Sequence, residues 1–126
     1  MTDASYADAL ILFGITGDLA RRKLFSALYD LTAAGNLDMR VIGVASRGWD
    51  DETLRKKAHE ALVDSGRPID EEVFARLAAN LSYVSGNYRE PRTYQAIQEK
   101  ASGSLRAVSY LAIPPSLFED VVEGLA

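Results

Sequence analysis

The sequence contains no cysteine and only one histidine. The absence of cysteine excludes disulfide bonds and cysteine-based metal sites. The single histidine, His59, cannot form a zinc site alone, and a histidine-based catalytic triad would have to use it. His59 falls within a helical pattern away from the motif described below. We therefore expect a surface or boundary role for it, and no metal site in the chain.

Long apolar segments are also missing. No apolar run approaches the roughly 20 residues that cross a membrane. The first residues, MTDASYADA, are acidic and lack the basic start and apolar core of a signal peptide. These features predict a soluble, cytoplasmic protein with no membrane partner.

Basic residues are in the minority. The chain has 14 lysines and arginines against 18 aspartates and glutamates, a net charge of −4, with both signs interspersed. A nucleic-acid-binding surface would need a basic patch or stripe, so no nucleic-acid partner is expected. Hydrophobic residues form 48% of the 126 residues, enough for one compact domain with its own core.

The most informative segment joins an apolar run to a helical pattern through two glycines. The apolar residues 9–13 are followed by Gly14-Ile15-Thr16-Gly17, and the helical pattern begins near Asp18. A strand, a glycine turn and a helix N-terminus together bind the pyrophosphate of a dinucleotide. The spacing is G-x-x-G-x-x-A, with Ile15 where a third glycine is usual. A turn with a purely structural role has the same pattern.

Apolar runs alternate with helical patterns along the whole chain. Strands are predicted over 8–14, 40–45, 81–85 and 106–113, and helices over 18–34, 51–65, 71–80, 91–102 and 116–124. This alternation predicts an α/β fold, a doubly wound, Rossmann-like parallel sheet in the order 3-2-1-4. The first helix should bury Ala20, Leu24, Ala27, Leu28 and Leu31, and the second Leu54, Ala58, Ala61 and Leu62.

The pattern provides four strands, whereas a complete domain of this kind has about six. The fourth strand would then be an unprotected apolar edge. We expect residues 1–126 to be an incomplete NADP-binding domain, truncated before its last strands, with no substrate domain in this chain.

The end of the second predicted strand indicates which nicotinamide cofactor is preferred. An acidic residue there binds the ribose 2′-OH of NAD, whereas arginine suits the 2′-phosphate of NADP. This strand ends in Ala45-Ser46-Arg47-Gly48, which favours NADP. A solvated surface charge is the alternative role of Arg47. Asp50 and Asp51 follow and are interpreted as helix N-caps.

Several segments resemble the glucose-6-phosphate dehydrogenase family. The run from Gly14 to Lys23, GITGDLARRK, resembles the family signature G-x-[ST]-G-D-L-A-[KR]-[KR]-K. The resemblance continues through VIGVASR at 41–47, YVSGNY at 83–88 and YLAIPP at 110–115. In the family the basic residue usually follows the position of Ala45 directly, so Arg47 lies one residue late.

The resemblance implies hydride transfer from C1 of glucose 6-phosphate to NADP, giving 6-phosphogluconolactone in the pentose phosphate pathway of carbohydrate metabolism. It places Lys23 near the sugar phosphate. The family segments R-I-D-H-Y-L-G-K-E and E-K-P are absent here, so no catalytic residue is expected in this chain and the chain alone should be inactive. A homo-oligomer is expected through a C-terminal part.

Cofactor contacts are predicted from residues at the carboxyl ends of the strands, and Ile113-Pro114 should face the glycine turn. The predicted set is Gly14, Ile15, Thr16, Gly17, Asp18, Leu19, Ser46, Arg47, Asn87, Tyr88, Ile113 and Pro114. Asp18 can instead cap the first helix, and Tyr88 can instead cover the sheet.

Two other functions fit part of the pattern. A non-catalytic NADP(H)-binding module would need no catalytic base. A short-chain reductase-like domain would need a Tyr-x-x-x-Lys pair, but Tyr94 is followed four residues later by Gln98 and Tyr110 by Pro114.

Overall fold

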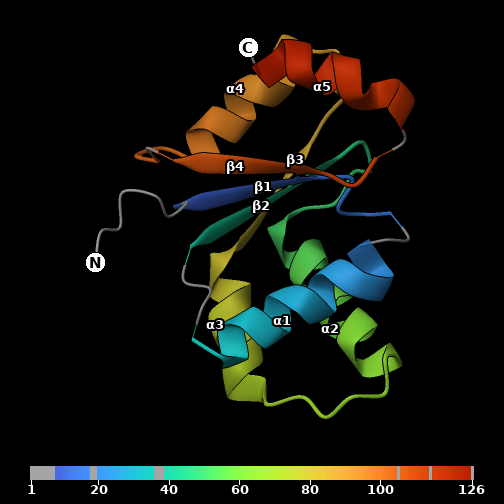
Figure 1. The fold of residues 1–126 in the computed structure, drawn as a ribbon, viewed down its shortest axis with the longest axis vertical. Coiled ribbons are helices and arrows are strands. Elements are labelled where there is room, and N and C mark those ends of the chain that lie inside the picture. Colours follow the sequence, from blue (N-terminus) through green and yellow to red (C-terminus); the bar gives the residue numbers. More distant parts are fainter. Residues whose placement is uncertain (1–7, 18–19, 36–38, 105, 114, 126) are drawn as a thin grey trace.

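The computed structural model describes residues 8–17, 20–35, 39–104, 106–113 and 115–125, which form a helix-covered parallel sheet (Figure 1). The sheet has the order β3-β2-β1-β4, as predicted. Its strands are β1 (Ala9–Phe13), β2 (Arg40–Ala45), β3 (Leu81–Ser85) and β4 (Ala107–Leu111). Helices α1 (Phe25–Ala33), α2 (Asp51–Asp64) and α3 (Glu71–Asn80) cover one face. Helices α4 (Pro91–Lys100) and α5 (Phe118–Leu125) cover the other.

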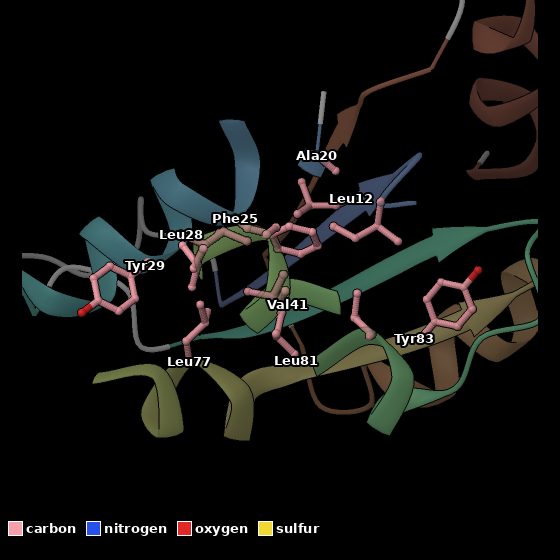
Figure 2. Close-up of a cluster of buried hydrophobic side chains, with 14 of the residues drawn as sticks. Leu12, Ala20, Phe25, Leu28, Tyr29, Val41, Leu77, Leu81 and Tyr83 are labelled. Atoms are coloured by element: carbon pink, nitrogen blue, oxygen red, sulfur yellow. The ribbon is translucent and has the colours of Figure 1, made fainter. Parts of the chain in front are cut away.

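The two central strands are buried on both faces, as parallel strands between helices should be. Successive side chains alternate between two cores. Leu12 and Val41 join the cluster beneath α1, α2 and α3 (Figure 2), whereas Phe13 and Ile42 join the cluster beneath α4 and α5. The two central strands are thus covered on both faces, and the carboxyl edge of the sheet remains for ligands.

The residues at the helix ends explain where the helices begin and stop, and the predicted N-cap role of Asp50 is confirmed. The Asp50 carboxylate accepts the Thr53 N–H at 2.7 Å, and Asp70 accepts the Glu72 N–H at 2.9 Å. Pro91 is the first residue of α4, and Gly35, with φ +76°, follows the C-cap of α1. The predicted buried face of α2 is confirmed in full.

The predicted buried face of the first helix is partly wrong. Ala27 and Leu31 are exposed, and the buried positions are Ala20, Phe25, Leu28, Tyr29 and Thr32. The helix opens with a π-helical turn, η2 (Ala20–Leu24), before α1 begins. A π turn contains more residues than an α turn, so the step from Ala20 to Phe25 is five residues and the later buried face is rotated.

The two edge strands of the sheet, β3 and β4, differ in how they are covered. On β3 the outward Tyr83 N–H is accepted by the Asp51 carboxylate at 2.6 Å, and Lys100 Nζ lies 3.0 Å from the same carboxylate. Asp51 was expected to cap α2, but it protects this edge instead. On β4, by contrast, Val108 is 50% and Tyr110 46% exposed. The predicted open apolar edge is therefore present in the described chain.

Gly14 should be far less tolerant of a side chain than other left-handed glycines. A Cβ at Gly14 (φ +87°) would lie 2.2 Å from the Ala112 carbonyl oxygen, whereas one at Gly66 (φ +79°) would meet nothing within 4 Å in the part of the chain that the structure describes. Gly14→Ala should reduce the free energy of unfolding by about 2–5 kcal/mol, and Gly66→Ala by about 1–2 kcal/mol. Urea denaturation measures both, and equal losses would contradict the close contact of the turn with β4.

Candidate functional site

The glycine turn lies at the carboxyl end of β1, between the ends of β2 and β4. The Gly14 N–H donates to the Val44 carbonyl at 2.8 Å, and the Gly17 N–H closes the turn on the Gly14 carbonyl at 3.0 Å. On the other side, Ala112 N–H donates to the Phe13 carbonyl at 2.9 Å. These bonds hold the turn to both neighbouring strands.

Ile15 explains why this turn lacks a third glycine. Its side chain is only 1% exposed and belongs to the core beneath α1, α2 and α3. It occupies the space above Gly43 in β2, where an added Cβ would lie 2.8 Å from Ile15 Cγ2. The Ile15 side chain therefore anchors the turn to the core, and the predicted contact of Ile15 with the cofactor stays a prediction.

Gly17 presents the open side of the turn. It is exposed, and among the described atoms a Cβ placed there would contact just the Gly14 carbonyl oxygen, at 3.3 Å. The chain continues into the first helix with an Arg21 N–H to Gly17 carbonyl bond of 3.2 Å. A bare backbone of this kind allows an anionic group to approach closely.

A pocket of about 460 Å³, called here the turn pocket, adjoins Gly17. Four of the predicted cofactor-binding residues line it: Ile15, Thr16, Gly17 and Arg47. Its other lining residues are Arg21, Phe25, Trp49, Lys57, Glu60, Ala61 and Asp64. The lining has three cationic and two anionic side chains, a balance of +1, and Lys57 Nζ lies 3.6 Å from a Glu60 oxygen.

The loop after β2 is held by β3. The Tyr83 hydroxyl donates to the Arg47 carbonyl at 2.6 Å, and the Ser85 hydroxyl donates to the same oxygen at 2.8 Å. Tyr83 also lies 3.2 Å from the Ala45 carbonyl, and its ring is 5.9 Å from that of Trp49. Burial raises the pKa of Tyr83 to about 12, so its hydroxyl remains a donor at neutral pH.

A second, smaller hollow of about 240 Å³ is lined by Ser46, Asn87 and Tyr88, among others. Adjacent residues Ser46 and Arg47 therefore face different hollows. The Asn87 side-chain oxygen accepts the Arg89 N–H at 2.8 Å. The Tyr88 hydroxyl donates to the Val44 carbonyl at 3.3 Å, and burial raises its pKa. Tyr88 thus supports the sheet while lining the hollow.

Ile113 and Lys23, the other predicted residues that the structure describes away from the turn, do not line these two hollows. Ile113 is half-buried against the core beneath α4 and α5, and its Cγ2 would be 2.9 Å from a Cβ at Gly14. Lys23 is exposed on η2. Asp18, Leu19 and Pro114 lie outside the described residues. His59 Nε2 lies 3.0 Å from Glu71, between α2 and α3 and away from the turn, in the boundary position expected of it.

Sequence reasoning missed seven lining residues of the turn pocket, among them Arg21, Trp49 and Lys57. Arg21 follows Gly17 by four residues, one helical turn, which is a usable signal. Trp49 adjoins the Arg47 loop. For Lys57 no local signal exists, because only the packing of α2 beside α1 brings it to the pocket.

Within the described ranges no three histidine, aspartate or glutamate side chains gather as metal ligands. None of the helices there has both the length and the apolar character that a membrane span requires.

The parallel order of the sheet, with a glycine turn at the end of its central strand, defines an α/β domain of the Rossmann-like, nucleotide-binding class. Residues 11–126 match the family described as "Glucose-6-phosphate dehydrogenase, NAD binding domain". The chain belongs to the glucose-6-phosphate dehydrogenase family, and its domain is the one that takes a nicotinamide dinucleotide.

Curated relatives and solved structures agree on this family. The chain is 42% identical over 120 residues to glucose-6-phosphate 1-dehydrogenase 1 of Mycobacterium tuberculosis, covering 95% of this chain and 26% of that protein. A crystal structure of glucose-6-phosphate 1-dehydrogenase from Mycobacterium avium superposes with a TM-score of 0.90 at 44% identity, over 94% of this chain and 26% of the other. A glucose-6-phosphate dehydrogenase solved with its substrate glucose-6-phosphate gives 0.80 at 29% identity, over 94% and 27%. The chain thus spans about a quarter of the length of these relatives.

Proposed function

We propose that this chain is the coenzyme-binding part of an NADP-dependent glucose-6-phosphate dehydrogenase. The observation that carries the proposal is the bare Gly17 backbone beside the turn pocket, whose cationic side chains outnumber its carboxylates. Bound NADP would accept the hydride from C1 of glucose 6-phosphate, giving 6-phosphogluconolactone. The relatives named above, one of them solved with its substrate, support the reaction.

The pyrophosphate is assigned to the glycine turn. Gly14 and Gly17 fix the shape of the turn, and the absence of a side chain at Gly17 leaves its outer surface free for a phosphate. Thr16 adds a hydroxyl at the same pocket. This assignment gives the two glycines separate roles, one in packing and one in ligand approach.

The 2′-phosphate of NADP is assigned to the turn pocket, with Arg47 as its main partner. Arg47 presents a planar guanidinium, which suits bidentate phosphate binding. Arg21 and Lys57 line the same pocket and add to its attraction for a dianion. Glu60 and Asp64 oppose this attraction, but Glu60 is placed beside Lys57.

The substrate and cellular setting complete the proposal. Lys23, exposed on η2 six residues after Gly17, would attract the sugar phosphate. The proton acceptor for the C1 hydroxyl is not assigned to any residue of this chain. A homo-oligomer in the cytoplasm is the proposed state of the enzyme.

Activity is tested by replacing the equivalent N-terminal part of the Mycobacterium tuberculosis relative with this chain. Because the domain supplies the cofactor site, the hybrid should reduce NADP in the presence of glucose 6-phosphate within about an order of magnitude of the parent kcat/KM. NADPH absorbance measures the rate, with the unaltered relative as the control. A folded hybrid that binds NADP without turnover would favour a non-catalytic binding module.

Pyrophosphate binding is tested with Gly17→Val. The added side chain would project where the phosphate should approach, and among the described atoms its Cβ would contact one backbone oxygen. NADP and NAD should both bind at least about tenfold more weakly, a loss of about 1.4 kcal/mol, while the melting temperature changes little. Calorimetric titration of both cofactors is the measurement. Unchanged affinity in a folded variant would refute the assigned turn.

Cofactor preference is tested with Arg47→Ala. Loss of a charge-assisted hydrogen bond of about 1.5–3 kcal/mol should weaken NADP binding by about tenfold or more, and NAD binding by less than about twofold. Arg76→Ala, an exposed arginine on α3, is the matched control and should leave both affinities unchanged. Equal weakening of NADP and NAD would make Arg47 a structural residue.

A further inference from the structure

We propose that Tyr83 and Ser85 are positioning residues for cofactor selection, because their two hydroxyl groups hold the Arg47 backbone in the orientation that presents its guanidinium to the turn pocket. This inference rests on the proposed binding of NADP. The pair of hydroxyl groups is called here the hydroxyl clamp. The clamp lies on β3, whereas Arg47 lies in the loop after β2. Residues of β3 would therefore control the contact that Arg47 makes with the ligand.

The geometry of the clamp fixes one peptide group. Tyr83 Oη and Ser85 Oγ lie 2.6 and 2.8 Å from the Arg47 carbonyl oxygen, so both of its acceptor sites are used. The orientation of this carbonyl sets the peptide plane between Arg47 and Gly48. The backbone of Arg47, and with it the direction of its side chain, is thereby restricted.

Without the clamp this loop would have little to fix it. Ser46, Arg47 and Gly48 are all exposed, and a Cβ at Gly48 would meet no atom of the described residues within 4 Å. Glycine at this position permits rotation of the preceding peptide. Among the described residues, the Arg47 guanidinium has no hydrogen bond or ion pair of its own. Its position therefore depends on the backbone, and the guanidinium remains available to a ligand.

Tyr83 is suited to a fixed donor role. Its side chain is 5% exposed and packs in the core beneath α1, α2 and α3, with Asp51 accepting its backbone N–H. The strand, the ring and the hydroxyl are thus held together. Since its pKa lies near 12, the proton that it donates is retained at any pH at which the enzyme would work.

Loss of the hydroxyl clamp should weaken the binding of NADP more than the binding of NAD. A loop ordered before binding loses less conformational freedom when Arg47 engages the 2′-phosphate. NAD lacks that phosphate and gains nothing from an ordered Arg47. Removing the clamp should therefore lower affinity for NADP and leave affinity for NAD almost unchanged, which a general loss of structure would not do.

The test is calorimetric titration of NADP and NAD into the unaltered chain, Tyr83→Phe, Ser85→Ala and the double variant. Each single change removes one hydroxyl and should raise the NADP Kd about 2- to 10-fold, and the double change more, with NAD within about twofold. Tyr110→Phe and Ser109→Ala, the same replacements on the exposed strand β4, should change neither affinity. Ser85 is exposed at a strand end, so its variant should fold normally even if Tyr83→Phe does not.

The same titrations in an Arg47→Ala background show whether the clamp acts by positioning Arg47 or by supporting the structure of the whole domain. If the clamp acts through Arg47, its removal there should change the NADP Kd by less than about twofold. An equal loss with and without Arg47, or equal losses for NADP and NAD, would overturn the clamp. If Arg47→Ala alone left the preference for NADP unchanged, the assigned 2′-phosphate contact would fail first, and the clamp would fall with it.

Discussion

The arrangement of the site depends on the fit of Ile15 over Gly43. A glycine in the middle of a buried strand leaves a gap on one face, and the Ile15 side chain fills it. This contact fixes the turn to β2, while the Gly14 backbone is pressed against Ala112 at the end of β4. Both contacts tolerate almost no added atoms, and close packing of this kind transmits any displacement. The turn is therefore a rigid cradle set between three strands, and the ligand surface at Gly17 is fixed before any ligand arrives.

The close packing at the turn contrasts with the uneven covering of the two edges of the sheet. The β3 edge is closed by the Asp51 carboxylate, while Val108 and Tyr110 on β4 are half exposed. The protected side of the sheet is also the side on which the turn pocket and the Arg47 loop lie. The hydrogen bonds from Tyr83 and Ser85 to the Arg47 loop thus come from a strand that is itself held by Asp51.

Much of this fold was predictable from the sequence, because β2 and β3 are short buried runs with clear ends and α2 has regular helical spacing. The strand order followed from the glycine motif and the alternation of elements. The π-helical turn was not predictable, since no residue from Ala20 to Leu24 signals it, and its effect was to expose Leu31. The anchoring role of Ile15 and the approach of Lys57 to the turn pocket depend on tertiary packing, which spacing along the chain does not reveal.

The acidic residues after β2 sharpen the question of cofactor preference. A carboxylate at this point would favour the ribose hydroxyl of NAD, and Asp50 and Asp51 lie only a few residues beyond Arg47. Both carboxylates are engaged elsewhere. The Asp50 carboxylate accepts the Thr53 N–H, a bond that lowers its pKa, and Asp51 binds the edge of β3. The fold therefore engages the two acidic groups that follow Arg47 most closely in the sequence and leaves an arginine as the charged group at the strand end. Together with the excess of cationic over anionic side chains in the turn pocket, this is the electrostatic basis for the proposed choice of NADP.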